Sequence, residues 1–283
     1  MNTVFISILI ESLPFVLIGV FLAGIIQMFV SEQMVARIMP KNRVLAVLMA
    51  TILGALFPAC ECGIIPIVRR LVSKGVPMYA GIAFMLTGPV INPVVLFSTY
   101  VAFGNSWDMM IYRGGLAMLV AALVGIILSY QFKNEPLLLH PVTTSQSTAN
   151  VPFGRKLLGT LTHAVDEFFS VGKYLVIGAL VAAAMQTYIQ TSTLLEIGQS
   201  EAASSLVMMG LAFVLSLCSE ADAFIASSFQ TTFSTGSLVA FLVYGPMLDV
   251  KNTLMMLGTF KKRLVISIIT YVTLLVFVGS LFF

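Results

Sequence analysis

Phe57-Pro58-Ala59-Cys60-Glu61-Cys62-Gly63-Ile64-Ile65-Pro66 places two thiols and a carboxylate inside a long apolar run. A second stretch, Leu217-Cys218-Ser219-Glu220-Ala221-Asp222, has the same character about 158 residues later. All three cysteines of the chain lie in these two stretches. Thiols and carboxylates concentrated in apolar surroundings indicate a functional site.

The composition identifies the class of protein. Of 283 residues, 59% are hydrophobic and only 10% are charged, with a mean hydropathy of +1.02. A soluble domain is about one quarter charged, so this chain is expected to be an all-α, multi-pass membrane protein. Its net charge of +3 is not clustered as in a nucleic-acid-binding protein, and no P-loop motif indicates ATP coupling. Three cysteines do not form a disulfide framework.

The apolar runs predict about eight membrane segments in two halves. Residues 1–132 are expected to form an N-terminal membrane repeat, 133–162 a polar connector, and 163–283 a C-terminal membrane repeat. The connector is rich in Pro, Ser and Thr, as flexible linkers are. The predicted apolar runs are Val4–Val30, Val44–Phe57, Ile64–Val68, Met78–Phe103, Met109–Tyr130, Asp166–Gln190, Ala202–Leu217, Ala223–Phe233, Ser237–Gly258 and Leu264–Phe283.

The two halves show three matches in the same order, which indicates an internal duplication of the kind common in transporters. The matching pairs are Ile18-Gly19 with Ile177-Gly178, Cys60 with Cys218, and Gly88-Pro89 with Gly245-Pro246, at offsets of 159, 158 and 157. Gly19 and Gly178 are expected to allow close helix packing.

Basic residues favour a re-entrant path for the cysteine segments, because cytoplasmic loops collect Lys and Arg. If Val44–Val68 enters the membrane and returns with Cys60 at its tip, both flanking basic clusters are cytoplasmic. Each half then crosses three times, which makes the repeats inverted. The alternative, eight plain crossings, leaves one basic cluster outside.

Proline and glycine predict where the helices are broken. Pro58 and Pro66 cannot donate backbone hydrogen bonds and Gly63 tolerates unusual dihedral angles, so the Cys-Glu-Cys segment is expected to unwind. Further breaks are expected at Asn92-Pro93 and at Asp249, and before them at Gly88-Pro89 and Gly245-Pro246. Asn92 and Asp249 occupy equivalent positions, where their side-chain oxygens would support an ion site.

The predicted substrate donors combine soft thiols with harder carboxylates, and they are Cys60, Glu61, Cys62, Cys218, Glu220 and Asp222. This mixture suits a borderline divalent ion such as zinc, or a thiophilic metalloid species. The ion would be cargo; no permanently bound cofactor and no enzymatic activity are expected.

Several alternatives stay open. Glu220 and Asp222 are also placed to cap the following helix, and Glu11 is equally consistent with the membrane interface. Arg113 is expected to pair with an acid or to extend to the interface. The three thiols are also consistent with an intramembrane thiol–disulfide relay, and the chain with a non-transporting membrane subunit of a complex.

The Pro-x-Cys-x-Cys-Gly-x-x-Pro motif, with the Gly-Pro span after it, resembles the bacterial predicted-permease family that includes the organoarsenical efflux permease. The resemblance covers nearly the whole chain. It implies an inner-membrane permease of about eight segments in which Cys60 and Cys62 bind the substrate, with a small second membrane subunit as partner. A homodimer is a separate expectation for its assembly. Glu61 and Glu220 depart from the arsenical branch and favour a divalent cation.

Overall fold

The computed structural model describes residues 1–29, 34–35, 37, 39–57, 60–132, 138–139, 153–188 and 201–283. Every extended regular element among these residues is a helix, and one isolated β-bridge joins Leu138 to Phe260. The all-α class predicted from composition is confirmed.

The helices of the first half include the Cys60 stretch at the start of α4. They are α1 (Asn2–Phe29), α3 (Arg43–Leu56), α4 (Glu61–Ser73), α5 (Met78–Ile91), α6 (Pro93–Ala102) and α7 (Trp107–Gln131). Helix α4 extends to Ser73, so the second arm of the predicted hairpin is longer than the expected run Ile64–Val68.

The helices of the second half follow in a similar order of lengths. They are α8 (Phe153–Tyr188), α10 (Glu201–Leu215), α11 (Ser219–Ser228), α12 (Thr235–Met247), α13 (Val250–Thr259) and α14 (Lys262–Ser280). Helix α8 begins at Phe153, so the last ten residues of the segment expected as a connector are already helical. Most of the rest of that connector lies outside the described residues.

Five segments within the described part of the chain are long and apolar enough to cross a membrane. They are Asn2–Ile26, Met78–Ala102, Trp107–Gln131, Ala164–Tyr188 and Lys262–Ser280. Helices α3 and α10 are apolar but shorter. A membrane protein with several spans is therefore supported, while the count of about eight segments stays a prediction.

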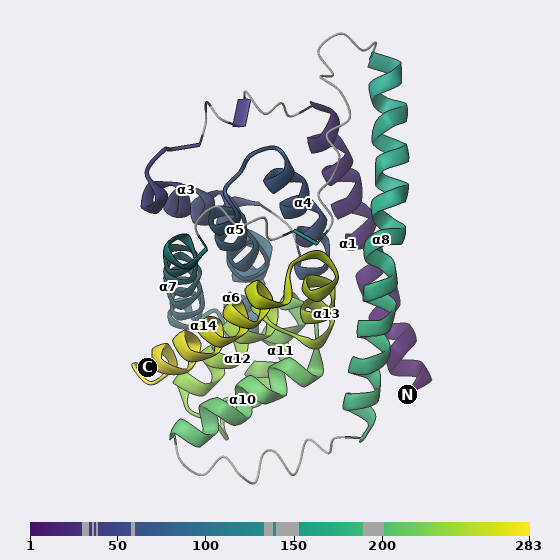
Figure 1. Ribbon diagram of the computed structural model, residues 1–283. Coiled ribbons are helices and arrows are strands. Elements are labelled where there is room, and N and C mark those ends of the chain that lie inside the picture. Colours follow the sequence, from purple (N-terminus) through teal and green to yellow (C-terminus); the bar gives the residue numbers. More distant parts are fainter. Residues whose placement is uncertain are drawn as a thin grey trace.

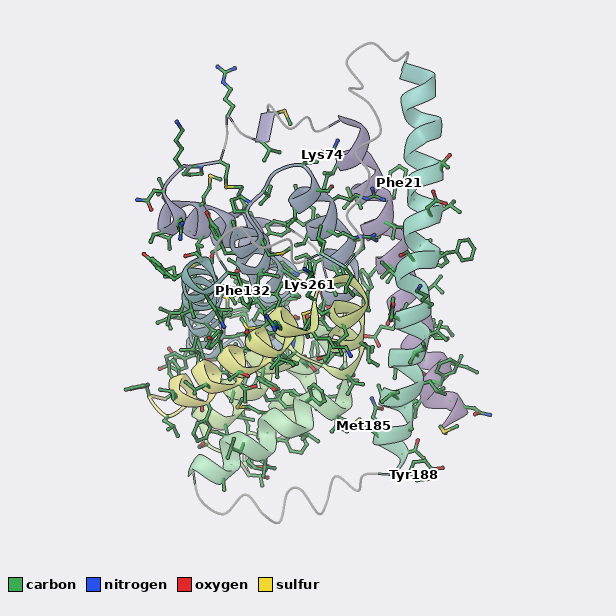
Figure 2. All side chains as sticks on the ribbon, in the orientation of Figure 1. Phe21, Lys74, Phe132, Met185, Tyr188 and Lys261 are labelled. Carbon is green, nitrogen blue, oxygen red and sulfur yellow. The ribbon has the colours of Figure 1, made fainter. Side chains whose placement is uncertain are left out.

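The two longest helices, α1 and α8, lie side by side and antiparallel (Figure 1). The N-terminal end of α1 lies beside the end of α8 that carries Tyr188 (Figure 2). Helix α1 packs on α4 and α8 packs on α13. A Cβ atom on Gly19 would lie 2.6 Å from the Cα atom of Gly63, and one on Gly178 would lie 2.9 Å from that of Lys251. The expected close-packing role of both glycines is confirmed.

Three of the predicted helix breaks are wrong. Pro66, Pro89 and Pro246 lie inside helices α4, α5 and α12. Apolar helices tolerate proline where neighbouring groups satisfy the freed carbonyl. The breaks predicted at Asn92-Pro93 and at Asp249 are present, and in both places a polar side chain caps the next helix. Pro58 lies outside the described residues.

Candidate substrate site

Cys60 and Cys218 each stand immediately before a helix. Cys60 is the N-cap of α4 and Cys218 is the N-cap of α11, both with extended backbone (φ −84°, ψ 166° and φ −75°, ψ 145°). The predicted unwound Cys-Glu-Cys turn is therefore wrong in part, because Glu61 and Cys62 already belong to the first turn of α4. A helix N-terminus presents free N–H groups and a positive partial charge. Both N-cap thiols thus lie at the positive end of a helix.

The cysteines of the two stretches meet at one small cavity. Its volume of about 10 Å³ matches the space that one water molecule needs. The side chains that line it are Glu11, Ser12, Phe15, Cys60, Glu61, Cys62, Cys218 and Lys251. Four of the six predicted substrate residues therefore lie around the same space, and helix α1 closes it.

Glycine contacts explain how α1 reaches this cavity. A Cβ atom on Gly63 would lie 2.8 Å from the carbonyl oxygen of Phe15 and 3.5 Å from the Cα atom of Gly19. Gly63 therefore supports the site by allowing α1 to approach the first turn of α4. Gly88 has a comparable role on α5, where a Cβ atom would meet the Ile64 side chain at 2.5 Å.

Two hydrogen bonds organise the acids of the site. The Cys218 thiol donates to Oε2 of Glu220 at 2.8 Å, so Glu220 lies beside the cavity although it does not line it. The Ser219 hydroxyl donates to Oε2 of Glu61 at 3.2 Å. The first turn of α11 is thereby linked to the first turn of α4.

Asp222 is separate from the cavity. It is buried, and its Oδ2 atom has no hydrogen-bond partner within the described part of the chain. Gly245 on α12 leaves space for this carboxylate, because a Cβ atom there would lie 3.0 Å from Oδ2. The nearby positive charge is Arg113 on α7. Asp222 is thus buried near Arg113 and is not part of the cavity wall.

Asn92 and Asp249 have equivalent structural roles as helix caps. Asn92 accepts a hydrogen bond from the Val95 backbone N–H at 2.9 Å, and Asp249 accepts one from that of Asn252 at 2.5 Å. Neither residue lines the cavity. The second oxygen of Asp249 lies 3.7 Å from the ammonium group of Lys251.

Two buried cations were missed as site residues. Lys251 lines the cavity, and Arg113 is fully buried, donating to Thr99 Oγ1 at 2.7 Å and to the Ser219 carbonyl at 3.1 Å. Glu11 also lines the cavity, although its sequence context was equally consistent with a position at the membrane interface. In the sequence, each of these three residues is a charged residue within an apolar run, and this pattern could have identified them as site residues.

The cysteines are free thiols, and the site is not a preformed metal centre. In the described residues, no group of three or more His, Cys, Asp or Glu side chains is placed so that it could hold a metal ion. A metal cargo would therefore have to draw thiols and carboxylates closer together as it binds.

Comparison with known proteins identifies the family of this chain. A family described as predicted permease, ArsP_1, matches residues 1–283. The chain belongs to this family. It is 66% identical over 281 residues to UPF0718 protein YcgR of Bacillus subtilis, covering 99% of this chain and 96% of the relative.

Two other relatives are more distant. A Streptococcus mutans protein named "Putative two-component membrane permease complex subunit" is 42% identical over 285 residues, which is 98% of this chain and 93% of the relative. UPF0718 protein MJ0584 of Methanocaldococcus jannaschii is 24% identical over 121 residues, 42% of this chain and 33% of the relative. No solved structure matches.

Proposed function

We propose that this permease is a secondary transporter that moves a thiophilic metal ion or metalloid species. The observation that carries the proposal is the shared cavity: Cys60, Cys62 and Cys218 come from two stretches far apart in sequence, yet all line one space with Glu61. Thiolates bind soft ions and carboxylates harder ones. A borderline divalent cation uses both.

The small size of the cavity fits a transport site better than a storage site. A space of about 10 Å³ holds no more than about one water molecule, so cargo enters only when helices or side chains move. Glu220, in contact with the Cys218 thiol, is available to complete the donor set in that movement. Transport needs no bond in the cargo to be broken, so no enzymatic step is proposed.

Inverted repeats would explain why the two cysteine stretches meet. Several observations support this arrangement: α1 and α8 are antiparallel, Gly19 and Gly178 each give close helix contact, and Cys60 and Cys218 are both N-caps. Asn92 and Asp249 also cap equivalent helices. In the proposed arrangement, α3–α4 and α10–α11 enter the membrane from opposite faces and their tips meet at the cavity.

The proposed setting is the bacterial inner membrane, with a second membrane subunit as partner. The printed name of the Streptococcus mutans relative refers to a two-component membrane permease complex, and the two chains match over almost their full length. A homodimer is the alternative assembly.

The test is metal accumulation in cells that express the wild type or a Cys60→Ser/Cys62→Ser variant. We expect wild-type cells to differ from empty cells in their content of one thiophilic ion, and the variant to remove most of that difference. Thr270→Ala, on the exposed face of α14, is the matched control. If the double variant behaves as the wild type for every thiophilic ion tried, the thiols do not carry cargo.

A thermal-shift panel on purified protein provides a second measurement. The transported ion should raise the unfolding temperature of the wild type, because a ligand that binds only the folded state stabilises it. The double cysteine variant should lose this shift while keeping its unfolding temperature without metal close to that of the wild type.

A further inference from the structure

Lys251 is an unusual residue to find at a site for a cation. Its side chain is 3% exposed and lines the cavity together with Glu61 and the three cysteines. It lies in the first turn of α13, and α8 packs against its backbone at Gly178. The backbone of Lys251 is therefore fixed, and only its four-carbon side chain is free to change position.

The ammonium group has a partner that holds it loosely. Its nitrogen lies 3.7 Å from Oδ2 of Asp249, beyond the usual hydrogen-bond range. The other oxygen of Asp249 accepts from the Asn252 backbone N–H at 2.5 Å and caps α13. Oδ2 itself has no hydrogen bond among the described residues. Asp249 thus keeps one oxygen available to receive the ammonium group more closely.

Space and charge together make the ammonium group a competitor for cargo. A cavity of about 10 Å³ has no room for an added ion beside the present side chains. A positively charged cargo at Glu61 would also be repelled by the ammonium charge, an interaction that is strong where water is excluded. Movement of the Lys251 side chain toward Asp249 would relieve both conflicts.

We propose that the Lys251 ammonium group occupies the transport site when no cargo is bound. It is displaced toward Asp249 when a divalent cation binds at Cys60, Glu61 and Cys62. The inference rests on the proposed transport function and adds to it the charge of the cargo and a mechanism of release. The ammonium group lowers the affinity for the cation, and its return promotes dissociation. Lys251 is thereby a specificity-determining residue that favours exchange over tight retention.

The experiment compares Zn²⁺ binding by calorimetry and Zn²⁺ flux in proteoliposomes for purified wild type and Lys251→Met. Removing a like charge from a dry site should tighten Zn²⁺ binding about tenfold or more. The flux at saturating Zn²⁺ should fall, because release is slowed. Phenylarsine oxide, a neutral thiol-binding probe, should bind both proteins equally, since it carries no charge to be repelled.

Two further variants control the result. Lys262→Met removes the same charge from an exposed position at the start of α14 and should change neither affinity nor flux. Asp249→Asn removes the acceptor of the ammonium group and should weaken Zn²⁺ binding, which is opposite to the effect of Lys251→Met. This second variant tests the inference even if Lys251→Met does not fold.

Each outcome bears on the inference. Equal or weaker Zn²⁺ binding in Lys251→Met overturns it, as does an equal tightening for phenylarsine oxide and Zn²⁺. If the wild type binds Zn²⁺ but Cys60→Ser/Cys62→Ser binds it equally well, the proposed function fails at the thiols. That result is distinct from a failure at Lys251, in which the cysteine variant loses Zn²⁺ but Lys251→Met leaves the affinity unchanged.

Discussion

The hydroxyl group of Ser219 donates a hydrogen bond of 3.2 Å to Oε2 of Glu61, although the two residues are 158 positions apart. Ser219 begins α11 and Glu61 begins α4, and a cysteine caps each of these helices. The bond therefore connects the two halves at the point where the thiols meet. It also leaves one carboxylate oxygen of Glu61 for the cavity.

Ser219→Ala is expected to lower stability and to release the Glu61 carboxylate. A hydrogen bond to a charged group contributes roughly 1.5–3 kcal/mol, so the midpoint of thermal unfolding in detergent should fall by several degrees. Ser228→Ala is the control on the same helix, because its hydroxyl donates to the Ile225 carbonyl one turn away and, among the described residues, makes no bond to the other half of the chain. An unfolding midpoint equal to that of Ser228→Ala would show that the link between the halves carries no stability.

Arg113→Met is expected to be far more destabilising. The guanidinium group is fully buried, joins α7 to α6 through Thr99 and to α11 through the Ser219 carbonyl, and lies near the buried Asp222 carboxylate. Each buried partner left without its hydrogen bond costs roughly 1–3 kcal/mol, and loss of the positive charge near the Asp222 carboxyl adds to this penalty. The measurement is the yield of folded protein by size-exclusion chromatography together with its unfolding midpoint.

The double variant Arg113→Met/Asp222→Asn separates charge from packing. If the penalty arises from the unpaired carboxylate, neutralising Asp222 should restore a large part of the lost stability. If the loss of stability in the double variant equals the sum of the losses in the two single variants, the guanidinium group acts through its hydrogen bonds to Thr99 and Ser219 instead.

Gly178→Ala is expected to disturb the contact between α8 and α13. The new methyl group would lie 2.9 Å from the Cα atom of Lys251, and backbone atoms cannot move aside as a flexible side chain can. Overpacking of this kind costs about 1–3 kcal/mol. Gly172→Ala, on the same helix with open space around it, is the matched control and should be neutral or slightly stabilising. Equal unfolding midpoints for the two variants would rule out a tight crossing at Gly178.

The sequence predicted features that depend on local chemistry. Three thiols, all in two similar apolar stretches, indicated one site, and Cys60, Cys62 and Cys218 do line one cavity. Close contact at Gly19 and Gly178 followed from their position in apolar helices. The breaks predicted at Pro66, Pro89 and Pro246 were wrong because proline only removes a donor. Those predicted at Asn92 and Asp249 are present, because each of these side chains also caps the next helix.

Features set by long-range packing were not predictable in the same way. Asp222 resembles Glu220 in sequence, but its position two residues farther along α11 turns it toward Gly245 rather than toward Cys218. Lys251 and Arg113 were visible as charges in apolar runs, yet only the folded chain shows which carboxylates they accompany. A sequence pattern gives the identity of a buried charge but not its partner.

The membrane topology is tested by cysteine labelling in a variant whose three native cysteines are replaced by serine. Single cysteines are introduced at Lys41, exposed before α3, and at Gln230, exposed after α11. If the two hairpins enter from opposite faces, a membrane-impermeant maleimide should label one position in intact cells and the other only after the membrane is opened. The basic residues near Lys41 favour a cytoplasmic position for it, so we expect Gln230 to be the position labelled from outside. Labelling of both positions from the same side would exclude inverted repeats, and the meeting of Cys60 with Cys218 would then require a different path of the chain.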